Sequence, residues 1–252
     1  MILVLAGTKD SREIINLLSD RDYNLLATVT TNYGRELLED SNIRVVQDEL
    51  DEIKLKRLIL ENEVNQIIDT THPFAVEISQ LAINVSNQLD KEYIRFERAK
   101  VEFADNELIT TVKGYQRAAK KAKKYNKVLL TIGSRRLNYF INEIDNWQEK
   151  LVARVLPTAK FIKKVEELGF SPQNIIGMQG PFSKKLNEVI LNDYEIDVLV
   201  TKASGSTGGV DSKVRAALEL KIPIILISRP PINYSQLANN YQELLRLINK
   251  KT

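Results

Sequence analysis

Cysteine is absent from the 252 residues of this chain. Its absence excludes disulfides, iron–sulfur clusters and thiolate nucleophiles, and it fits a cytoplasmic protein. Histidine is nearly absent as well, because His72 is the single one. The sequence therefore has no cluster of metal-binding residues, and we expect no bound metal.

Long apolar runs and a strong excess of one charge are also lacking. No stretch approaches the roughly 20 apolar residues of a membrane span, and the N-terminus lacks the basic start and cleavage site of a signal peptide. The formal net charge is only +3, and the basic residues scatter over many loops instead of forming a stripe with aromatic residues. We expect a cytoplasmic protein that binds neither membranes nor nucleic acids.

Short apolar runs alternate with amphipathic helical stretches from end to end, a pattern that predicts parallel βαβ units. The pattern is interrupted near residues 97–110, so we expect two Rossmann-like, doubly wound α/β domains with a ligand cleft between them. The first would comprise residues 1–98 and the second 99–252, and the last helix, 234–249, could pack on either. The expected strands are residues 2–5, 25–30, 44–46, 66–69, 93–96, 128–131, 151–156, 175–176, 198–201 and 222–227.

Ligands of doubly wound sheets bind beyond the carboxyl ends of the strands, where loops lead into helices. The first such loop lies in LAGTKDSREI, where Gly7 ends a strand and a helix begins after Asp10 or Ser11. Asp10 and Glu13 have capping-box spacing, and the amides of a helix start suit a pyrophosphate. The G-x-G-x-x-G pattern is absent, so this loop alone is a weak indication of a dinucleotide site.

The second loop, ATVTTNYGREL, lacks the acidic residue that an NAD-binding domain usually places there to hold the ribose hydroxyls. It offers Thr30, Thr31 and Arg35 instead. Hydroxyls and a guanidinium suit a 2′-phosphate, so the loop favours NADPH over NADH. The alternative is a capped loop with a surface arginine.

The third loop contains His72, in DTTHPFAVEIS. Asp69 closes a buried strand, and Pro73 suits the first turn of the following helix, which places His72 at or near the helix N-cap. A helix N-terminus disfavours the cationic imidazole, so a neutral hydrogen-bond donor is expected there. His72 is either a residue of a ligand site or a histidine that only caps the helix.

Two loops of the second half have the residues of an anion site. In GMQGPFSKKLN, Gly180 and Pro181 make a tight turn and Ser183 can cap the next helix. In LVTKASGSTGGVDSKVRAA, small residues allow a ligand to approach the backbone at a helix start, with lysines on either side. The small residues are Ser204, Gly205, Gly208 and Gly209, and the lysines are Lys202 and Lys213. The loop is not a P-loop, since G-x-x-x-x-G-K-[ST] is missing.

Arginines lie near the ends of several expected strands, where ligands bind. They are Arg95, Arg98, Arg135, Arg136, Arg154 and Arg229. Guanidinium groups hold carboxylates through paired hydrogen bonds. We therefore expect one half of the protein to bind a nucleotide and the other half to bind a molecule with several carboxylates.

Six stretches, in their order and spacing, resemble the precorrin-6A reductase family of cobalamin biosynthesis. They are LAGTKDSREI, DTTHPFAVEIS, YIRFER, GPFSKKLN, TKASGSTGGVDSKVRAA and IPIILISRPP. The resemblance covers essentially the whole chain and implies two Rossmann-like domains. It also implies NAD(P)H-dependent reduction of one double bond of the precorrin-6A or cobalt-precorrin-6A macrocycle, giving precorrin-6B or cobalt-precorrin-6B. The partner would be this anionic tetrapyrrole, passed to or from neighbouring enzymes of the pathway.

The resemblance also assigns roles to residues. Contacts to the cofactor, NADPH with NADH as the other option, would come from Gly7, Thr8, Ser11, Arg12, Thr30, Thr31, Arg35, His72 and Phe74. Contacts to substrate carboxylates would come from Arg98, Arg135, Arg154, Gly180, Ser183, Lys202, Ser204, Gly205, Gly208, Gly209, Lys213 and Arg229. The proton of the reduction could come from His72, Tyr33, a water molecule or a substrate carboxyl.

Two other functions stay open on the sequence alone. One is an NAD(P)-dependent reductase of another small anion, and the other is a two-lobed nucleotide-sensing regulator without catalysis. The Tyr-x-x-x-Lys pair of short-chain reductases is missing, because Ala119 stands at that spacing after Tyr115. Consumption of NAD(P)H with a tetrapyrrole would separate the enzyme from the regulator.

Overall fold

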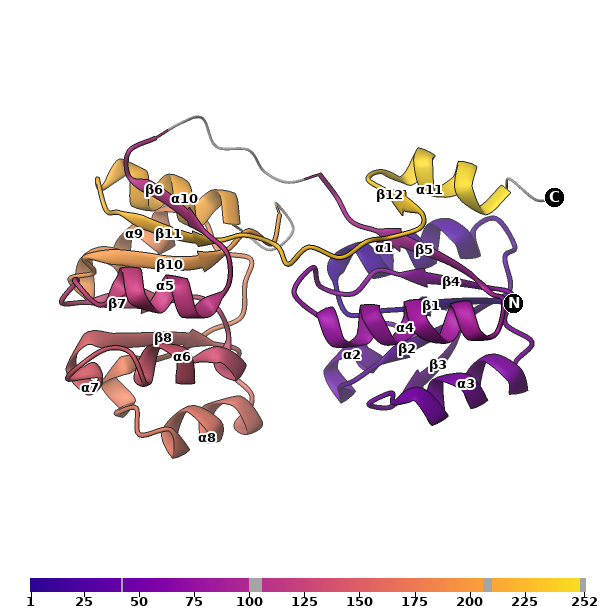
Figure 1. The fold of residues 1–252 in the computed structure, drawn as a ribbon, viewed down its shortest axis with the longest axis horizontal. Helices are drawn as coiled ribbons and strands as arrows, with labels where there is room; N and C mark the ends of the chain where they lie inside the picture. Colours follow the sequence, from indigo (N-terminus) through magenta and orange to yellow (C-terminus); the bar gives the residue numbers. More distant parts are fainter. Residues whose placement is uncertain (42, 100–105, 206–209, 250–252) are drawn as a thin grey trace. The chain divides into compact units, whose positions relative to one another are not determined.

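The structure is a computed structural model that describes residues 1–41, 43–99, 106–205 and 210–249. The chain divides into two compact units, which Figure 1 colours by sequence. Unit 1 combines Met1–Ala99 with Pro231–Thr252, and unit 2 is Lys100–Pro230. The last helix, whose place the sequence left open, packs into the core of unit 1. Gly208 and Gly209 of the expected anion loop lie outside the described residues.

Unit 1 has a six-stranded parallel sheet in the order β12-β5-β4-β1-β2-β3. The strands are β1 (Ile2–Leu5), β2 (Leu25–Val29), β3 (Arg44–Gln47), β4 (Gln66–Asp69), β5 (Glu92–Phe96) and β12 (Leu237–Ala238). The helices are α1 (Lys9–Ser19), α2 (Asn32–Glu36), η1 (Glu39–Ser41), α3 (Glu52–Glu61), α4 (Val76–Gln88) and α11 (Tyr241–Ile248). This is the Rossmann order, with β12 from the C-terminal segment in the sixth position.

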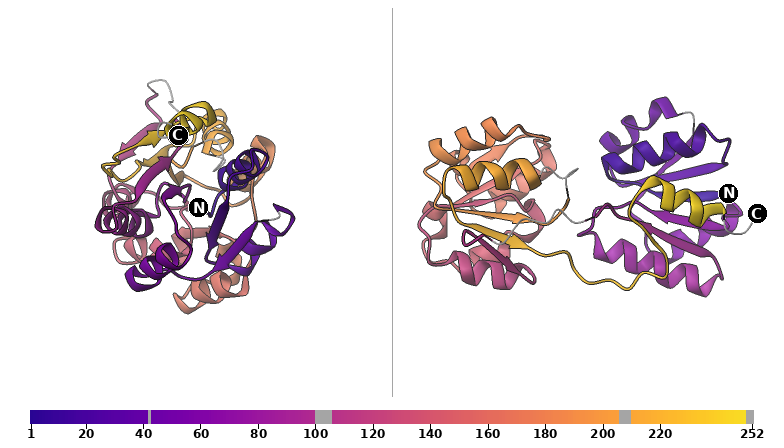
Figure 2. Two further views of the ribbon diagram at one scale, coloured as in Figure 1. Left: turned by 90° about the vertical axis from the view of Figure 1, so that its right-hand side faces the viewer. Right: turned by 90° about the horizontal axis from the view of Figure 1, so that it is seen from above.

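Alternate residues of β1 enter two cores, because successive side chains of a strand point to opposite faces of the sheet. Ile2 and Val4 join the core that contains residues of α1 and α11, whereas Leu3 and Leu5 join the core of α3 and α4. Every residue of β1, β2 and β4 is buried, as expected for central strands covered on both faces. Figure 2 shows the helices on both faces of each sheet.

Two helices begin later than expected. α4 begins at Val76, because the Ala75 amide donates to the His72 carbonyl at 2.7 Å and closes a turn before the helix. The expectation that Pro73 starts this helix with His72 near its N-cap is therefore wrong. α11 begins at Tyr241, because part of the segment before it pairs with β5 as β12.

Unit 2 has a second six-stranded parallel sheet, in the order β6-β11-β10-β7-β8-β9. The strands are β6 (Ile109–Val112), β7 (Val128–Leu130), β8 (Leu151–Val155), β9 (Ile175–Gly177), β10 (Val198–Lys202) and β11 (Ile224–Ile227). The helices are α5 (Tyr115–Ala122), η2 (Ser134–Arg136), α6 (Asn138–Ile141), α7 (Trp147–Lys150), α8 (Ala159–Glu167), η3 (Pro172–Asn174), α9 (Lys184–Asp193) and α10 (Val210–Glu219). Read from β9 to β6, the order is again that of a Rossmann sheet. β6, which the sequence pattern did not predict, takes the outer position that β12 takes in unit 1.

The C-terminal segment contributes to the stability of unit 1, and this can be tested. Leu244 of α11 is 0% exposed in its core, whereas Leu237 of β12 is 44% exposed. We expect Leu244→Ala to lower the free energy of unfolding by about 2–5 kcal/mol, because it leaves a cavity among buried side chains. Leu237→Ala is the control and should change it by less than about 0.5 kcal/mol. Urea denaturation followed by circular dichroism measures both, and a small change in Leu244→Ala would contradict this packing.

Candidate functional site

In each unit, the loops that follow two neighbouring strands lie where doubly wound sheets bind ligands. The order of strands reverses between β1 and β4 in unit 1 and between β7 and β10 in unit 2. Loops at such a point leave the sheet in opposite directions and open a crevice at the carboxyl ends of the strands. The loops after β1 and β4 contain the turn of Gly7 and the turn of His72, and the loop after β10 follows Lys202, the last residue of that strand.

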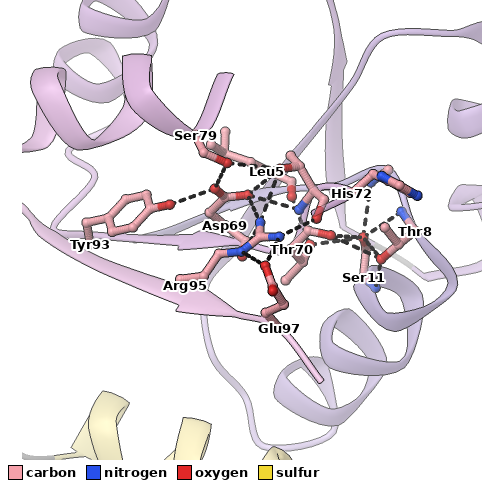
Figure 3. Close-up of polar contacts among 12 residues, drawn as sticks. Leu5, Thr8, Ser11, Asp69, Thr70, His72, Ser79, Tyr93, Arg95 and Glu97 are labelled. Carbon is pink, nitrogen blue, oxygen red and sulfur yellow. Dashed lines mark hydrogen bonds and ion pairs between the residues drawn. The ribbon is translucent and has the colours of Figure 1, made fainter. Parts of the chain in front are cut away.

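Hydrogen bonds between Thr8, Ser11 and Thr70 fix the loop after β1 (Figure 3). Thr8 is the N-cap of α1 and accepts from the Ser11 amide at 3.2 Å, while Ser11 Oγ accepts from the Thr8 amide at 3.0 Å. Thr8 Oγ1 donates to the Thr70 carbonyl at 3.0 Å, and the Thr70 hydroxyl lies 2.9 Å from Ser11 Oγ. The capping box is therefore Thr8 with Ser11 and not Asp10 with Glu13, because α1 begins at Lys9 and not after Asp10.

Asp10 and Glu13 contact Arg98 instead of capping α1. Arg98 Nε lies 2.8 Å from Asp10 Oδ1, and Arg98 Nη2 lies 2.7 Å from Glu13 Oε2 and 2.6 Å from Tyr241 Oη. A hydrogen bond from Tyr241 lowers the pKa of Glu13. In unit 1, Arg98 thus joins the first turn of α1 to α11, and its contact with a substrate stays a prediction.

The loop after β2 contains the short helix α2. Thr31 is its N-cap and accepts a hydrogen bond from the Gly34 amide at 3.0 Å. Tyr33 and Arg35 are exposed on α2, and Thr30 is exposed just before its N-cap. These three side chains lie beyond the carboxyl end of β2, where the adenine ribose binds in a Rossmann domain. The expected contact with a 2′-phosphate stays a prediction.

Asp69, the last residue of β4, is the centre of a buried polar network (Figure 3). Its Oδ1 accepts from Arg95 Nη1 at 2.8 Å, from the Thr71 amide at 2.9 Å and from the Thr71 hydroxyl at 2.6 Å. Its Oδ2 accepts from the hydroxyls of Ser79 and Tyr93, each at 2.6 Å. Donors from β5, α4 and the loop itself therefore surround one carboxylate.

Arg95 completes this network from β5. Its Nη2 donates to the Thr71 carbonyl and to Glu97 Oε2, each at 2.9 Å. Its guanidinium carbon lies 5.6 Å from the centre of the Tyr234 ring. The sequence placed Arg95 among the arginines that face a ligand, and this is wrong. β5 lies between β4 and β12, and the Arg95 side chain is 0% exposed with its charge used inside the unit.

The network keeps Asp69 ionised and Tyr93 protonated. Burial alone would raise the pKa of Asp69, but the Arg95 charge and the hydroxyl donors outweigh burial and hold the pKa below its ordinary value. Burial raises the pKa of Tyr93, and the Asp69 carboxylate raises it further. Tyr93 therefore stays a hydrogen-bond donor and Asp69 an acceptor at neutral pH.

His72 follows this network directly in the chain. The Phe74 amide lies 3.2 Å from His72 Nδ1 and donates to it. An amide can donate only to an unprotonated nitrogen, so this geometry assigns the neutral imidazole with its proton on Nε2. The Phe74 ring lies 5.8 Å from the imidazole, centre to centre. His72 is thus a neutral hydrogen-bond donor that is held by a turn, not by a helix N-cap.

Four basic side chains of unit 2 interact as like charges. Arg136 lies in η2 after β7, Arg154 in β8, Lys202 at the end of β10 and Lys213 in α10. The charge of Arg136 acts on Lys202, and the charges of Lys202 and Arg154 act on Lys213. Arg154 is 6% exposed and Lys213 is 9% exposed. Positive charges gathered in this way attract an anion.

Burial lowers the pKa values of Arg154, Lys202 and Lys213, and like charges add to this effect for the two lysines. Burial, together with Arg136, lowers the pKa of Lys202 to about 8. Burial, Arg154 and Lys202 lower the pKa of Lys213 to about 7. Burial also lowers the pKa of Arg154 to about 10. A bound anion would raise these pKa values again, because an opposite charge favours the protonated form.

Residues that follow β9 orient Arg154. Its Nη1 donates to Asn187 Oδ1 at 2.9 Å, and its guanidinium carbon lies 4.6 Å from the centre of the Phe182 ring. Asn187 in turn donates to the Ser183 carbonyl at 2.8 Å, and Ser183 caps α9 by accepting from the Leu186 amide at 3.1 Å. The structure therefore brings two predicted residues, Arg154 and Ser183, into one cluster.

Arg229 lies against the backbone of the loop after β10. Its Nε donates to the Ala203 carbonyl at 2.9 Å. Gly205 has a φ of 87°, and a Cβ there would lie 3.0 Å from Arg229 Nη2. Only glycine suits this conformation and this close approach. Ser204, between Ala203 and Gly205 in the chain, is 9% exposed.

Gly180 and Arg135 are the other predicted residues of unit 2. Gly180 precedes Pro181 through a cis peptide bond, and a Cβ at Gly180 would lie 3.2 Å from the Phe182 ring. Arg135 is exposed in η2, one residue before Arg136. Their roles toward a ligand stay predictions.

The sequence analysis missed several residues of these two sites. The internal ion pair of Arg95 could have been predicted, because Arg95 stands inside the apolar stretch YIRF and a buried guanidinium requires an acidic partner. Nothing local identified Ser79, Tyr93, Phe182 or Asn187, since each one joins its site only when another element is placed beside it.

Two classes of feature are not found in the described part of the chain. No three or more His, Cys, Asp or Glu side chains are grouped so that they could hold a metal ion. No helix within the same residues is long and apolar enough to cross a membrane.

Comparison with known proteins places this fold and these loops in one family. A solved structure of CobK precorrin-6A reductase superposes with a TM-score of 0.81, covering 98% of this chain and 95% of that chain at 22% sequence identity. The family model described as Precorrin-6x reductase CbiJ/CobK matches residues 1–249. This chain belongs to that family. The resemblance stated from the sequence and the expected pair of Rossmann-like domains are both confirmed.

Several curated relatives match along nearly their whole length. The cobalt-precorrin-6A reductase of Methanocaldococcus jannaschii is 39% identical over 98% of this chain and 97% of its own. That of Priestia megaterium is 37% identical over 100% of this chain and 99% of its own. A precorrin-6A reductase of Rhodococcus erythropolis is 26% identical over 92% of this chain and 90% of its own. Members of the family thus carry the names of both the cobalt-containing and the metal-free substrate.

The lowered pKa of Lys213 makes the stability of the protein depend on pH. An unfolded chain keeps this proton up to the ordinary lysine pKa of 10.5, whereas the folded protein loses it above about pH 7. The unfolded state therefore binds more protons between these values, and the free energy of unfolding should rise with pH across this window. Lys213→Met should reduce the rise.

Denaturant unfolding at a series of pH values between 7 and about 10 measures this slope. Lys163→Met is a matched control, because the Lys163 side chain is 77% exposed in the same unit. The control should keep the slope of the wild-type protein. An unchanged slope in Lys213→Met would contradict the shifted pKa of Lys213.

Proposed function

We propose that this protein is an NAD(P)H-dependent reductase that converts cobalt-precorrin-6A to cobalt-precorrin-6B in cobalamin biosynthesis. The observation that carries the proposal is the buried cluster of cations at the strand-order switch of unit 2, together with the His72 turn at the same point of unit 1. Membership of the family supports the reaction class. The relatives at 39% and 37% identity are named for the cobalt substrate, which favours it over metal-free precorrin-6A.

Unit 1 is proposed to bind the nicotinamide cofactor. α1 presents its N-terminus at the strand-order switch, and a Cβ at Gly7 would meet no atom within 4 Å, so there is open space beside this turn. The Gly7 amide donates to Ser11 Oγ at 3.0 Å. Ser11 and Thr8 therefore shape the turn that receives the phosphates, while Arg12, in the first turns of α1, adds positive charge.

The loop after β2 is proposed to hold the ribose end of the cofactor. Thr30, Thr31 and Arg35 lie where a Rossmann domain binds this group, and the residue directly after β2 is Thr30, where an NAD-binding domain usually has an acid. This composition favours NADPH, with NADH as the other option. His72 and Phe74 would then lie toward the nicotinamide end.

Unit 2 is proposed to bind the macrocycle through its carboxylates. Arg154 and Lys213 provide buried donors, Lys202 provides a half-buried one, and Arg229 lies against the loop after β10. Charge-assisted hydrogen bonds in a site of low polarity hold carboxylates more strongly than surface lysines do. An acidic tetrapyrrole fits this requirement better than a neutral ligand does.

Reduction of a double bond adds a hydride to one atom and a proton to the other. The bound cofactor supplies the hydride, so the protein needs no covalent nucleophile. His72, with its proton on Nε2, would donate a hydrogen bond at the nicotinamide end and orient the ring. His72 itself, a water molecule or a substrate carboxyl would provide the proton. Tyr33, the other candidate, lies in α2, at the proposed ribose end of the cofactor.

An anaerobic assay tests the function directly. We expect oxidation of NADPH or NADH to depend on added cobalt-precorrin-6A. The reduced macrocycle should absorb at shorter wavelengths and form in an amount equal to the cofactor oxidised. The same assay with metal-free precorrin-6A compares the two substrates. Cofactor binding without oxidation in the presence of either macrocycle would favour the nucleotide-sensing regulator instead.

Lys202→Ala tests the assignment of the macrocycle to unit 2. We expect the Kd of the macrocycle to rise by about 10- to 100-fold, the effect of losing one hydrogen bond from a charged group. The Kd of the nicotinamide cofactor should stay within about twofold, measured by fluorescence titration. Equal losses for both ligands would contradict the division between the units, and Lys163→Ala serves as the exposed control.

His72→Ala tests the role of the histidine. We expect turnover to fall by about tenfold or more, because the group that orients the nicotinamide is removed. The circular dichroism spectrum should match that of the wild-type protein, since His72 lies in a turn and is only partly buried. Wild-type turnover in this variant would leave His72 as a purely structural residue.

A further inference from the structure

The backbone before His72 is held by side chains from other elements. The Thr70 carbonyl accepts from Thr8 Oγ1 at 3.0 Å, and the Thr71 carbonyl accepts from Arg95 Nη2 at 2.9 Å. The Thr71 amide donates to Asp69 Oδ1 at 2.9 Å. Both peptide planes that flank Thr71 are therefore fixed, although Thr71 lies in neither a helix nor a strand.

Asp69 and Arg95 are the two groups on which this arrangement depends. The Arg95 guanidinium bridges Asp69 Oδ1 and the Thr71 carbonyl, so it spans the turn from β5. Ser79 from α4 and Tyr93 from β5 donate to the other oxygen of Asp69. Rotation of the carboxylate would break hydrogen bonds on both of its oxygens, and its orientation is therefore fixed (Figure 3).

A buried ion pair of this kind contributes little net stability, because apolar residues of similar volume can often replace it at no cost. Its distinctive property is a fixed geometry. The end of the fixed segment is His72, whose ring nitrogen and carbonyl are then held by the amides of Phe74 and Ala75. The network is therefore suited to setting the position of one imidazole.

We propose that Asp69 and Arg95, supported by Ser79 and Tyr93, are positioning residues that keep His72 in its Nε2–H tautomer and in one orientation. The inference rests on the proposed function, in which His72 orients the nicotinamide ring. It names the residues that hold His72 in the geometry needed for that role. The four residues act through the Thr71 backbone and touch neither ligand. Loss of one hydroxyl donor to Asp69 loosens the turn and lets the imidazole change tautomer.

The single histidine of the chain makes the tautomer directly observable. In protein labelled with ¹⁵N, the imidazole gives one pair of nitrogen signals that need no assignment. We expect the wild-type pair to be well separated, as in a neutral ring with the proton on Nε2. In Ser79→Ala and in Tyr93→Phe, the two signals should move toward each other, because two tautomers then exchange.

Ser86→Ala is the matched control for Ser79→Ala. Ser86 lies on the same helix and is 1% exposed, but its hydroxyl donates to the Ile83 carbonyl at 2.9 Å and not to Asp69. We expect this variant to keep the wild-type nitrogen signals. Its unfolding midpoint should shift about as much as that of Ser79→Ala, since each variant loses one buried serine hydroxyl.

Kinetics provides the second measurement. We expect kcat to fall about tenfold in Ser79→Ala and Tyr93→Phe, while KM for the nicotinamide cofactor stays within about twofold, because orientation is lost and phosphate binding is kept. Ser79→Ala carries the test alone if Tyr93→Phe does not fold. Wild-type nitrogen signals with wild-type kcat in Ser79→Ala would overturn the inference. Failure of the wild-type protein to reduce either macrocycle would instead contradict the proposed function, and the nitrogen signals would still decide the inference.

Discussion

Parallel pairing of the strands is the constraint on which both sites depend. Each sheet places the carboxyl ends of its strands at one edge, and the reversal of strand order opens a space between two of the loops at that edge. In unit 1 this brings together the Gly7 turn and the His72 turn, which are about sixty residues apart in the chain and are joined by the hydrogen bond from Thr8 to the Thr70 carbonyl. An antiparallel sheet would divide the same residues between two edges.

The two units treat buried charge in opposite ways. In unit 1 the positive charge of Arg95 is paired with the negative charges of Asp69 and Glu97, and the result is a rigid turn. In unit 2 the charges of Arg154, Lys202 and Lys213 have the same sign. Burial lowers the pKa of all three groups, and neighbouring positive charges lower the pKa values of the two lysines further. A polyanionic ligand would raise these pKa values again, whereas unit 1 gains nothing comparable from an anion at Asp69. The contrast supports the proposed roles of the two units. Unit 1, the proposed cofactor unit, has a fixed geometry, whereas unit 2, the proposed substrate unit, has positive charges that an anionic ligand would neutralise.

The sequence predicted the central strands well, because strands buried on both faces of a parallel sheet must be apolar along their length. It missed two of the outer strands, β6 with four residues and β12 with two, although it predicted the other outer strands, β3 and β9. It also misplaced the starts of α1 and α4. Thr8 caps α1 through hydrogen bonds with Ser11, and a turn that begins at His72 makes α4 start later. The local sequence is compatible with more than one such set of hydrogen bonds, so it does not determine where either helix starts.

The sequence by itself determined the fold class and the family, because these follow from apolar periodicity and from short local motifs. Only the tertiary structure decided which charged residues are paired inside a unit and which are gathered with like charges. Arg95 and Arg154 look alike in the sequence, since each is an arginine within an apolar strand. Arg95 meets Asp69 across the β4–β5 pair, whereas Arg154 meets Asn187, Phe182 and the charge of Lys213. The difference lies in neighbours that are distant in the chain, and charge interactions depend on distance in space.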